Sequence, residues 1–364
     1  MRKIALLCIL FCACAPKNEL PCINLSVVSK IDLKHTIPLD SIVVRTEMIP
    51  LDNNPQAPLV GAITGFCESN DYFYLVSDGI VYQYNKKGEF LRQIGAKGRG
   101  PGEYLYVKHM VCDENDVLYV FDYNTQTLLQ YDSTGKLLTI YRRDFQEDVF
   151  IASSFLLHND KVIFTSSTNS ERMDLLAYDS FSGDEAFISK REREMGMEGI
   201  MGVTLSFGSH ENPYLFHYFN DTVYRYRDHT LIPELIIKME PKPTFAELAD
   251  LSKGFSGGIV QISDLVQGGD FLFITYNDSR VPAKQRWELL MSLYNTNTNQ
   301  YAPHVTIVDS ESPYLSISSG NQLFQGLNVN TLFMVQTPAK ILETEQRDGL
   351  KEDDNPILIK YQLK

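Results

Sequence analysis

The sequence predicts an all-β fold, a six-bladed β-propeller built from four-stranded antiparallel blades. Two markers predict it. A short polar turn recurs six times before an apolar strand, and a tyrosine followed by a polar turn residue also recurs six times, in strict alternation with the first marker. A four-stranded blade cannot cover both of its faces alone, so repetition around an axis is the expected way to bury them.

The two markers place the second and third strands of each repeat. The turn occurs at Asn70-Asp71, Asn115-Asp116, Asn159-Asp160, Glu211-Asn212, Gly269-Asp270 and Val329-Asn330, and the tyrosines are Tyr84, Tyr131, Tyr178, Tyr226, Tyr294 and Tyr361. Successive tyrosines are 47, 47, 48, 68 and 67 residues apart. The longer spacings indicate insertions of about twenty residues in the last two repeats, on top of a blade-sized unit.

The first repeat shows the strand pattern most clearly. Strands are expected at about 60–68, 72–76, 80–85 and 90–94, with a hairpin turn at 86–89. Four strands in about 45 residues is the size of one propeller blade.

The two ends of the repeat array predict how the ring closes. The third strand of the last repeat, at about 357–363, leaves no residues for a fourth, and one spare strand, at about 42–49, precedes the first repeat. Pairing these two strands completes the sixth blade and leaves no exposed edge at the joint.

The N-terminus has the pattern of a targeting segment. Arg2 and Lys3 precede a short apolar run, 4–11, which is too short to span a bilayer. Cleavage before Cys14 would make residues 1–13 a lipoprotein signal peptide and Cys14 the lipidated residue; the alternative is an ordinary secretory signal cleaved after Ala15. We favour the lipoprotein, with location at the cell envelope, on the outer membrane.

The expected domain boundaries follow from this assignment. Residues 14–38 contain three prolines and little periodicity and are expected to be a tether, and residues 39–364 form the propeller. The formal net charge is -13, which disfavours nucleic acid and anionic lipid as partners. We therefore expect membrane contact through the lipid only and no nucleic-acid binding.

Three cysteines remain beside Cys14 in the mature chain. Cys22, Cys67 and Cys112 match no disulfide framework and no zinc spacing. Cys67 and Cys112 are 45 residues apart, which suggests equivalent positions in consecutive repeats. They are expected to be small apolar core residues.

A glycine-rich loop, Gly98-Arg99-Gly100-Pro101-Gly102-Glu103, separates the first repeat from the second. Its N–H groups could form an anion-binding nest, with Arg99 and Glu103 as ligand-binding candidates. The other interpretation is a tight turn, in which Gly98, Gly100, Pro101 and Gly102 are structural and Glu103 accepts N–H bonds. The structural interpretation is favoured, and no Gly-Lys-Ser/Thr follows as a P-loop requires.

Three further residues are ligand-binding candidates. Lys108 and His109 lie on the expected inner strand of the second blade, so one of them should face the central channel. Trp287, the only tryptophan, lies in a basic insertion of the fifth repeat, where it could stack on a sugar ring or pack under its own loop.

No metal site and no catalytic residue is assigned from the sequence. His109, His158 and His210 are spaced by 49 and 52 residues, but they fall at different heights in the repeat and show no metal-ligand spacing. No cofactor is predicted; a calcium ring of inward carboxylates is permitted by the composition without being indicated by it.

The run GRGPGEY at 98–104, the spare strand ending in Ile49-Pro50-Leu51, and the strand-turn-strand 122–135 together resemble the six-bladed β-propeller lipoproteins of Gram-negative bacteria. These are related in fold to NHL-repeat and TolB-like propellers. The resemblance covers residues 40–364 and implies fold and cell-envelope location; it implies no established activity.

The expected function is a lipid-anchored binding or scaffold module for a glycan, a peptide or an envelope protein. The alternative is a metal-dependent hydrolase or lyase with its site in the central channel. Propellers host both kinds of function, so the fold alone does not choose between them, although binding is favoured here.

Overall fold

A computed structural model describes most of the chain. It covers residues 20–25, 35–142, 258–279, 289–345 and 347–364, and between them the stretches 152–158, 161–166, 175–178, 185–189, 204–208, 212–217, 221–227 and 230–241. The predicted signal peptide 1–13, the predicted lipidation site Cys14 and the ligand-binding candidate Trp287 lie outside the described residues.

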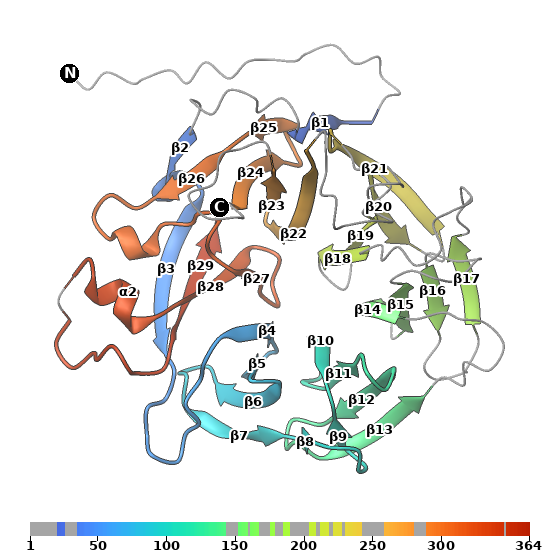
Figure 1. Ribbon diagram of the computed structural model, residues 1–364, viewed down its shortest axis with the longest axis vertical. Coiled ribbons are helices and arrows are strands. Elements are labelled where there is room, and N and C mark those ends of the chain that lie inside the picture. Colours follow the sequence, from blue (N-terminus) through green and yellow to red (C-terminus); the bar gives the residue numbers. More distant parts are fainter. Residues whose placement is uncertain are drawn as a thin grey trace.

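Six antiparallel sheets surround a central axis, each with its first strand innermost (Figure 1). Blade 1 contains β4 (Ile63–Glu68), β5 (Tyr72–Ser77), β6 (Ile80–Asn85) and β7 (Phe90–Ile94); blade 2 contains β10 (Val107–Cys112), β11 (Leu118–Asp122), β12 (Thr127–Tyr131) and β13 (Leu137–Arg142). Blade 3 contains β14 (Ala152–His158), β15 (Lys161–Ser166), β16 (Leu175–Tyr178) and β17 (Glu185–Ser189); blade 4 contains β18 (Thr204–Gly208), β19 (Pro213–His217), β20 (Thr222–Arg227) and β21 (Thr230–Lys238). Blade 5 contains β22 (Val260–Gly268), β23 (Phe271–Asp278), β24 (Leu289–Asn295) and β25 (Gln300–Ala302); blade 6 contains β27 (Leu323–Gln325), β28 (Thr331–Gln336), β29 (Ile357–Leu363) and β3 (Val43–Pro50).

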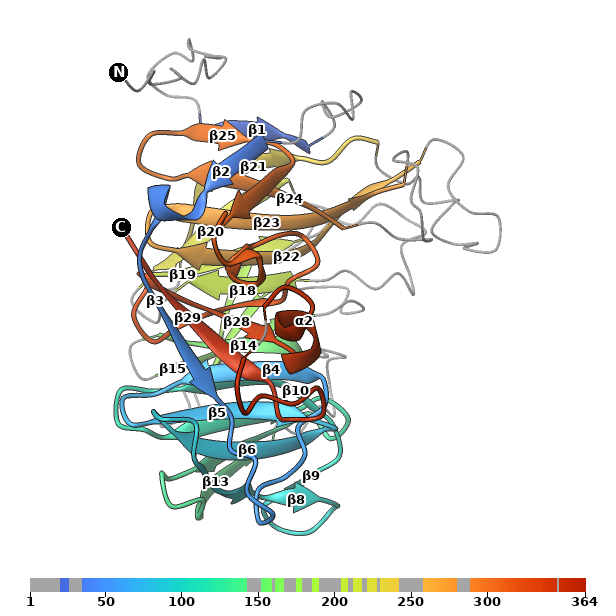
Figure 2. The same cartoon turned by 90° about the vertical axis from the view of Figure 1, so that its left-hand side faces the viewer.

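The ring closes as the sequence predicts. β3 pairs antiparallel with β29 from Ile357 opposite Pro50 to Leu363 opposite Val43 (Figure 2). The chain therefore supplies the outer strand of blade 6 from its N-terminal side, and the inner strands contact one another around the whole ring. The prediction of six four-stranded blades closed by these two strands is confirmed.

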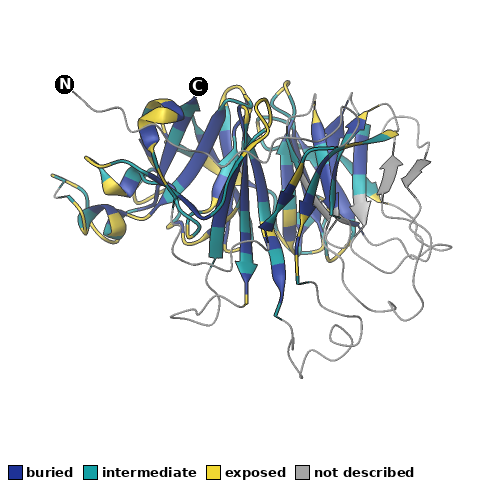
Figure 3. Cartoon of the chain, turned by 90° about the horizontal axis from the view of Figure 1, so that it is seen from above, coloured by how far each residue is buried: buried dark blue, intermediate teal, exposed yellow. Residues whose placement is uncertain are grey.

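Side chains on alternate positions of each strand pack toward opposite neighbours, as the two-residue period of a strand requires. In blade 1, Phe73 and Leu75 belong to the core shared with blade 6, whereas Tyr74 and Val76 belong to the core shared with blade 2. Buried residues consequently fill the spaces between blades and exposed residues gather on the turns (Figure 3).

Two of the recurring tyrosines, Tyr131 and Tyr361, combine burial between blades with a hydrogen bond to a connecting loop. Tyr131 and Tyr361 are almost fully buried, and their hydroxyls donate to the carbonyls of Gly102 at 2.9 Å and Leu315 at 2.8 Å. A tyrosine can thus fill the space between blades while its hydroxyl ties down a connecting loop.

Two short strands lie inside the segment predicted as an irregular tether. β1 (Cys22–Asn24) pairs parallel with the outer strand β21, and β2 (His35–Pro38) pairs parallel with β26 (Val305–Val308). Ile23 and Leu25 are buried against blade 4. The prediction of a tether over 14–38 did not anticipate these strands, because each is too short to show a periodic pattern.

Helical structure is brief in the described part of the chain: α2 (Pro338–Leu342) and the 3-10 turns Leu39–Ser41 and Pro313–Leu315. None of the helices described there is long and apolar enough to cross a membrane. The remaining pairing is a small parallel ladder, β8 (Ala96–Lys97) with β9 (Glu103–Tyr104), within the glycine-rich loop.

Candidate functional site: the central channel

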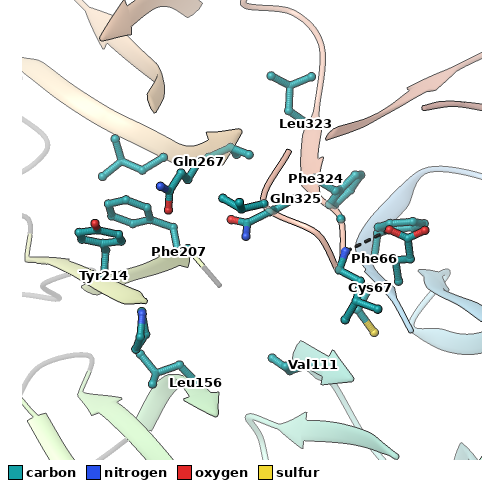
Figure 4. A pocket seen from close by; sticks show the side chains of 18 of the residues that line it. Phe66, Cys67, Val111, Leu156, Phe207, Tyr214, Gln267, Leu323, Phe324 and Gln325 are labelled. Atoms are coloured by element: carbon teal, nitrogen blue, oxygen red, sulfur yellow. Dashed lines mark hydrogen bonds between the residues drawn. The ribbon is translucent and has the colours of Figure 1, made fainter. Parts of the chain in front are cut away.

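The inner strands of all six blades border one cavity of about 1120 Å³ on the ring axis (Figure 4). β4, β10, β14, β18, β22 and β27 each contribute, together with the turns that follow several of them. A pocket at this place is assembled from residues far apart in the sequence, since each blade supplies only a few positions.

Aromatic rings form part of the cavity wall. Phe207 and Tyr214 are stacked, with ring centroids 5.4 Å apart and planes inclined by 15°. Phe66 and Phe324 lie across the joint between blades 1 and 6, with centroids also 5.4 Å apart. These rings offer flat apolar surfaces to a ligand that enters the channel.

Carboxamide side chains provide most of the neutral hydrogen-bonding groups of the wall. Gln267 and Gln325 are directed into the cavity from blades 5 and 6 (Figure 4). Gln322, Asn328 and Asn330 also border it. Each carboxamide both donates and accepts, so the wall suits a ligand with alternating hydroxyl, amide or carbonyl groups.

A bulge near the start of an inner strand recurs in four blades. The ladder register shifts between Ile63 and Gly65, Val107 and His109, Ala152 and Ser154, and Ile262 and Asp264. The residue after the bulge is therefore equivalent in each blade, and in blades 2 and 5 it is His109 and Asp264. Bulges re-aim side chains and are frequent next to functional sites.

Lys108 and His109 both border the cavity, so the structure brings these two predicted candidates to the channel. Lys108 is the exposed bulge residue. The ring of His109 meets that of Phe155 edge-on, with centroids 5.3 Å apart. Burial, together with the charge of Lys108, lowers the pKa of His109 to about 4, so the imidazole is neutral at neutral pH. A ligand-binding role for either residue stays a prediction.

Asp264 is a channel residue that sequence reasoning missed. Burial raises the pKa of its carboxyl to about 6, although the Leu265 N–H, at 2.9 Å, favours the charged form. The sequence signal is a single carboxylate inside the strand VQISDLVQG, and the direction of its side chain can be predicted only once the bulge is known.

Glu68 forms a charged cluster where blades 1 and 6 meet at the channel wall. Its side chain is 6% exposed, and its carboxylate accepts from Lys86 at 2.8 Å, Lys360 at 3.1 Å and the Leu327 N–H at 3.0 Å. Burial alone would raise the pKa of Glu68, but these donors outweigh it and hold the pKa below its usual range. The cluster connects blade 1 to the closing strand β29.

The glycine-rich loop lies away from the channel, and none of its residues borders the cavity. The Glu103 carboxylate accepts from the Gly100 N–H at 2.7 Å, and Gly98 donates to the Tyr104 carbonyl at 3.1 Å. A Cβ at Gly98 would collide with the Glu103 carboxylate. Gly102 has φ +75, a left-handed conformation that suits the Pro101-Gly102 turn.

These contacts support the structural interpretation of the loop. Arg99 is exposed. Ligand binding by Arg99 and Glu103 stays a prediction that no observed contact tests.

No group of three or more histidine, cysteine, aspartate or glutamate side chains among the described residues is arranged to hold a metal ion. The residues that follow the bulge in the four blades are Gly65, His109, Ser154 and Asp264. Asp264 is the one carboxylate among these four equivalent positions. The described part of the channel therefore offers hydrogen bonding and aromatic contact, and its carboxyls, Glu68, Glu114, Asp264 and Asp270, form no metal-binding group.

A ring of six four-stranded blades around one shared cavity defines a six-bladed β-propeller with a central cavity. The chain belongs to the DUF4934 family, described as a domain of unknown function, whose family model matches residues 22–362.

Two solved structures share the fold. A candidate exported protein of Bacteroides fragilis NCTC 9343 has a TM-score of 0.64 and 18% identity, covering 95% of this chain and 100% of that one. A member of the DUF4221 family from Bacteroides vulgatus ATCC 8482 has a TM-score of 0.53 and 10% identity, covering 88% and 97%. No curated protein sequence matches significantly.

Proposed function

We propose that this chain is an exported, lipid-anchored propeller of the cell envelope that binds a neutral polar chain, a glycan or a peptide segment of an envelope protein, in its central channel. The sequence of residues 1–14 and the likeness to a candidate exported protein support export. The observation that carries the binding proposal is the cavity of about 1120 Å³ with walls of aromatic rings and carboxamides.

The size and chemistry of the cavity favour this class of ligand. Ligand pockets commonly measure about 300 to 1,000 Å³, so a cavity of about 1120 Å³ has room for several sugar units or amino-acid residues. Rings such as Phe207 and Phe324 supply contact area, and Gln267 and Gln325 supply paired donors and acceptors. The net charge of -13 makes a polyanionic ligand a poor match.

A thermal melt of the mature chain against panels of neutral oligosaccharides and unstructured peptides tests the proposal. A ligand present at about 100 times its dissociation constant adds about 2.7 kcal/mol to the free energy of unfolding, which raises the melting midpoint by a few degrees. Gln325→Ala should abolish the shift. Gln300→Ala removes an exposed glutamine from the outer strand β25 and should leave the shift intact.

Two results would contradict channel binding. One is the absence of any shift across both panels. The other is a shift of unchanged size in Gln325→Ala and in Phe324→Ala, which would place the ligand elsewhere on the molecule.

The alternative is a metal-dependent hydrolase or lyase working in the same channel. It requires several inward carboxylates or imidazoles at one height, and the described residues provide His109 and Asp264 on opposite blades. The same melt, repeated after EDTA and with added divalent metals, distinguishes the two functions. A midpoint that falls with EDTA and is restored by one metal would favour the enzyme.

A further inference from the structure

Cys67 and Cys112 lie on facing sides of neighbouring blades, which their sequence spacing conceals. Cys67 is opposite Tyr74, the third residue after its turn, whereas Cys112 is opposite Leu118, the second residue after its turn. The two cysteines are therefore one position out of step and are not equivalent, contrary to the prediction from their spacing of 45. Because side chains alternate along a strand, a one-residue offset sends them to opposite faces of their blades.

The packing agrees with this geometry. Cys67 and Cys112 belong to the same apolar cluster, which fills the space between blades 1 and 2 and contains Tyr74, Met110 and Leu118. Their host strands β4 and β10 contact each other. The thiols thus meet across the blade 1–blade 2 interface, in contrast to the neighbouring Phe66, which packs toward blade 6.

The Cys67 thiol lies close enough to Cys112 to affect the pKa of Cys112. Burial, reinforced by the hydrogen bond with Cys67, raises the pKa of the Cys112 thiol. Tyr74 lies near both cysteines, which contribute, after burial, to raising the pKa of its phenol. Disulfide formation requires Cβ atoms within about 4.5 Å of each other and a Cβ–S–S–Cβ dihedral near about 90°, and the shared interface of β4 and β10 is where these two thiols can meet both requirements.

The two thiols differ in access. Both residues border the channel cavity, but Cys112 is 3% exposed and Cys67 is only half-buried. A thiol or disulfide reagent that enters the channel therefore reaches Cys67 first.

We propose that Cys67 and Cys112 form a disulfide that joins blades 1 and 2 at the channel wall once the chain has been exported. The inference rests on the export part of the proposed function, since disulfides persist in oxidising compartments outside the cytosol. It assigns to these residues a modification site rather than the purely apolar role expected from sequence.

The bond forms by thiol–disulfide exchange with a disulfide-bonded donor. The Cys67 thiolate attacks one donor sulfur, breaks the donor S–S bond and leaves a mixed disulfide at Cys67, with one donor thiol released. Cys112 then loses its proton to solvent and attacks the Cys67 sulfur, which expels the second donor thiol. The two cysteines lose two electrons in total, and the donor disulfide gains them.

The test uses the mature chain, reduced and then exposed to oxidised glutathione, with alkylation of the remaining thiols and mass analysis of intact protein and peptides. The expected product is a Cys67–Cys112 cross-linked peptide and a chain lighter by two hydrogen atoms. Cys112→Ser should instead accumulate a glutathione adduct on Cys67. Cys67→Ser should stay unmodified at Cys112, and Cys22→Ser should still form the cross-link.

A melt of each serine variant shows that it is folded before its thiols are scored. The proposal is overturned if the folded parent keeps both thiols under oxidised glutathione, or if Cys67→Ser is modified as readily as Cys112→Ser. The chain recovered from cells, alkylated at lysis, separates the two proposals. If the signal peptide is cleaved and both thiols are free, the disulfide proposal is refuted and the export proposal stands. If the signal peptide is intact, export is contradicted, and the experiment with oxidised glutathione decides the disulfide proposal.

Discussion

Replacing Glu68 by glutamine should destabilise the ring at the joint between blades 1 and 6. The carboxylate is 6% exposed and is held by Lys86, 33% exposed, and Lys360, 28% exposed. Removing one partner of a buried ion pair typically costs about 3–5 kcal/mol, but both lysines reach solvent, which reduces the loss toward that of surface pairs. We therefore expect Glu68→Gln to lower the free energy of unfolding by about 2 kcal/mol.

The pH dependence of the same variant carries a definite sign. The pKa of Glu68 in the folded state is lower than its usual 4.5, so the cluster contributes fully above pH 4.5 and its contribution is lost as the pH falls through the folded pKa. The stability difference between the parent and Glu68→Gln should be constant between about pH 6 and 8 and shrink in acid.

Urea unfolding monitored by far-UV circular dichroism measures both the loss of stability in Glu68→Gln and its pH dependence. Glu89→Gln is the matched control, because Glu89 is exposed and bonds only to Asn85 in its own hairpin among the contacts described. Lys360→Met should cost less than Glu68→Gln, since Lys86 remains with the carboxylate. A loss below about 0.5 kcal/mol at neutral pH, or a difference that persists unchanged in acid, would refute the reasoning.

Three further predictions concern the glycine-rich loop, the 52–60 segment and the channel. Gly98→Ala should lower the melting midpoint by a few degrees, because its Cβ displaces the Glu103 carboxylate and frees a backbone N–H at a cost of about 1–2 kcal/mol. Asn355→Ala should lower the free energy of unfolding, measured in urea, by about 2–3 kcal/mol, because the buried Asn355 carboxamide makes hydrogen bonds to three backbone groups at 2.6–2.9 Å. The control Asn54→Ala, at an exposed position, should leave the free energy of unfolding almost unchanged. Asp264→Asn should melt above the parent at pH 7 and with it near pH 4, because the folded pKa of about 6 means that parental stability falls as the pH rises from about 4 to 6.

Each of these has an outcome that contradicts it. Gly98→Ala should become nearly neutral in a Glu103→Ala background, and an undiminished cost there would exclude the proposed clash. Equal losses for Asn355→Ala and Asn54→Ala would mean that the three hydrogen bonds contribute nothing net. A constant difference between Asp264→Asn and the parent from pH 4 to 7 would show that the carboxyl does not titrate in this range.

The number of blades and the closure were predictable because both depend on local, repeated burial. The turn before the second strand and the tyrosine of the third strand each recur because every blade faces the same packing problem. β1 escaped prediction for the opposite reason: Cys22–Asn24 is too short for a pattern, and its partner β21 lies about two hundred residues away.

The channel could be predicted to exist but not described in detail. Lys108 and His109 were placed on the inner strand correctly, whereas Asp264 and Gln325 carry no local motif and reach one cavity only through the ring. A single bulge or turn residue also changes which face a side chain occupies, as Cys67 and Cys112 show. Such one-residue offsets follow from three-dimensional pairing rather than from spacing.

With the proposed lipid on Cys14, the docking of β1 on blade 4 would also limit how far the propeller can lie from the membrane. A segment without attachment from Cys14 to Pro38 could extend roughly 80 Å, but β1 pairs with β21 from Cys22 onward. A lipid on Cys14 would therefore be separated from the propeller by about eight residues, roughly 27 Å when fully extended. Because β21 is the outer strand of its blade, the attachment is on the circumference of the ring. The lipid would therefore attach the propeller to the bilayer through its outer circumference, with neither opening of the channel at the point of attachment.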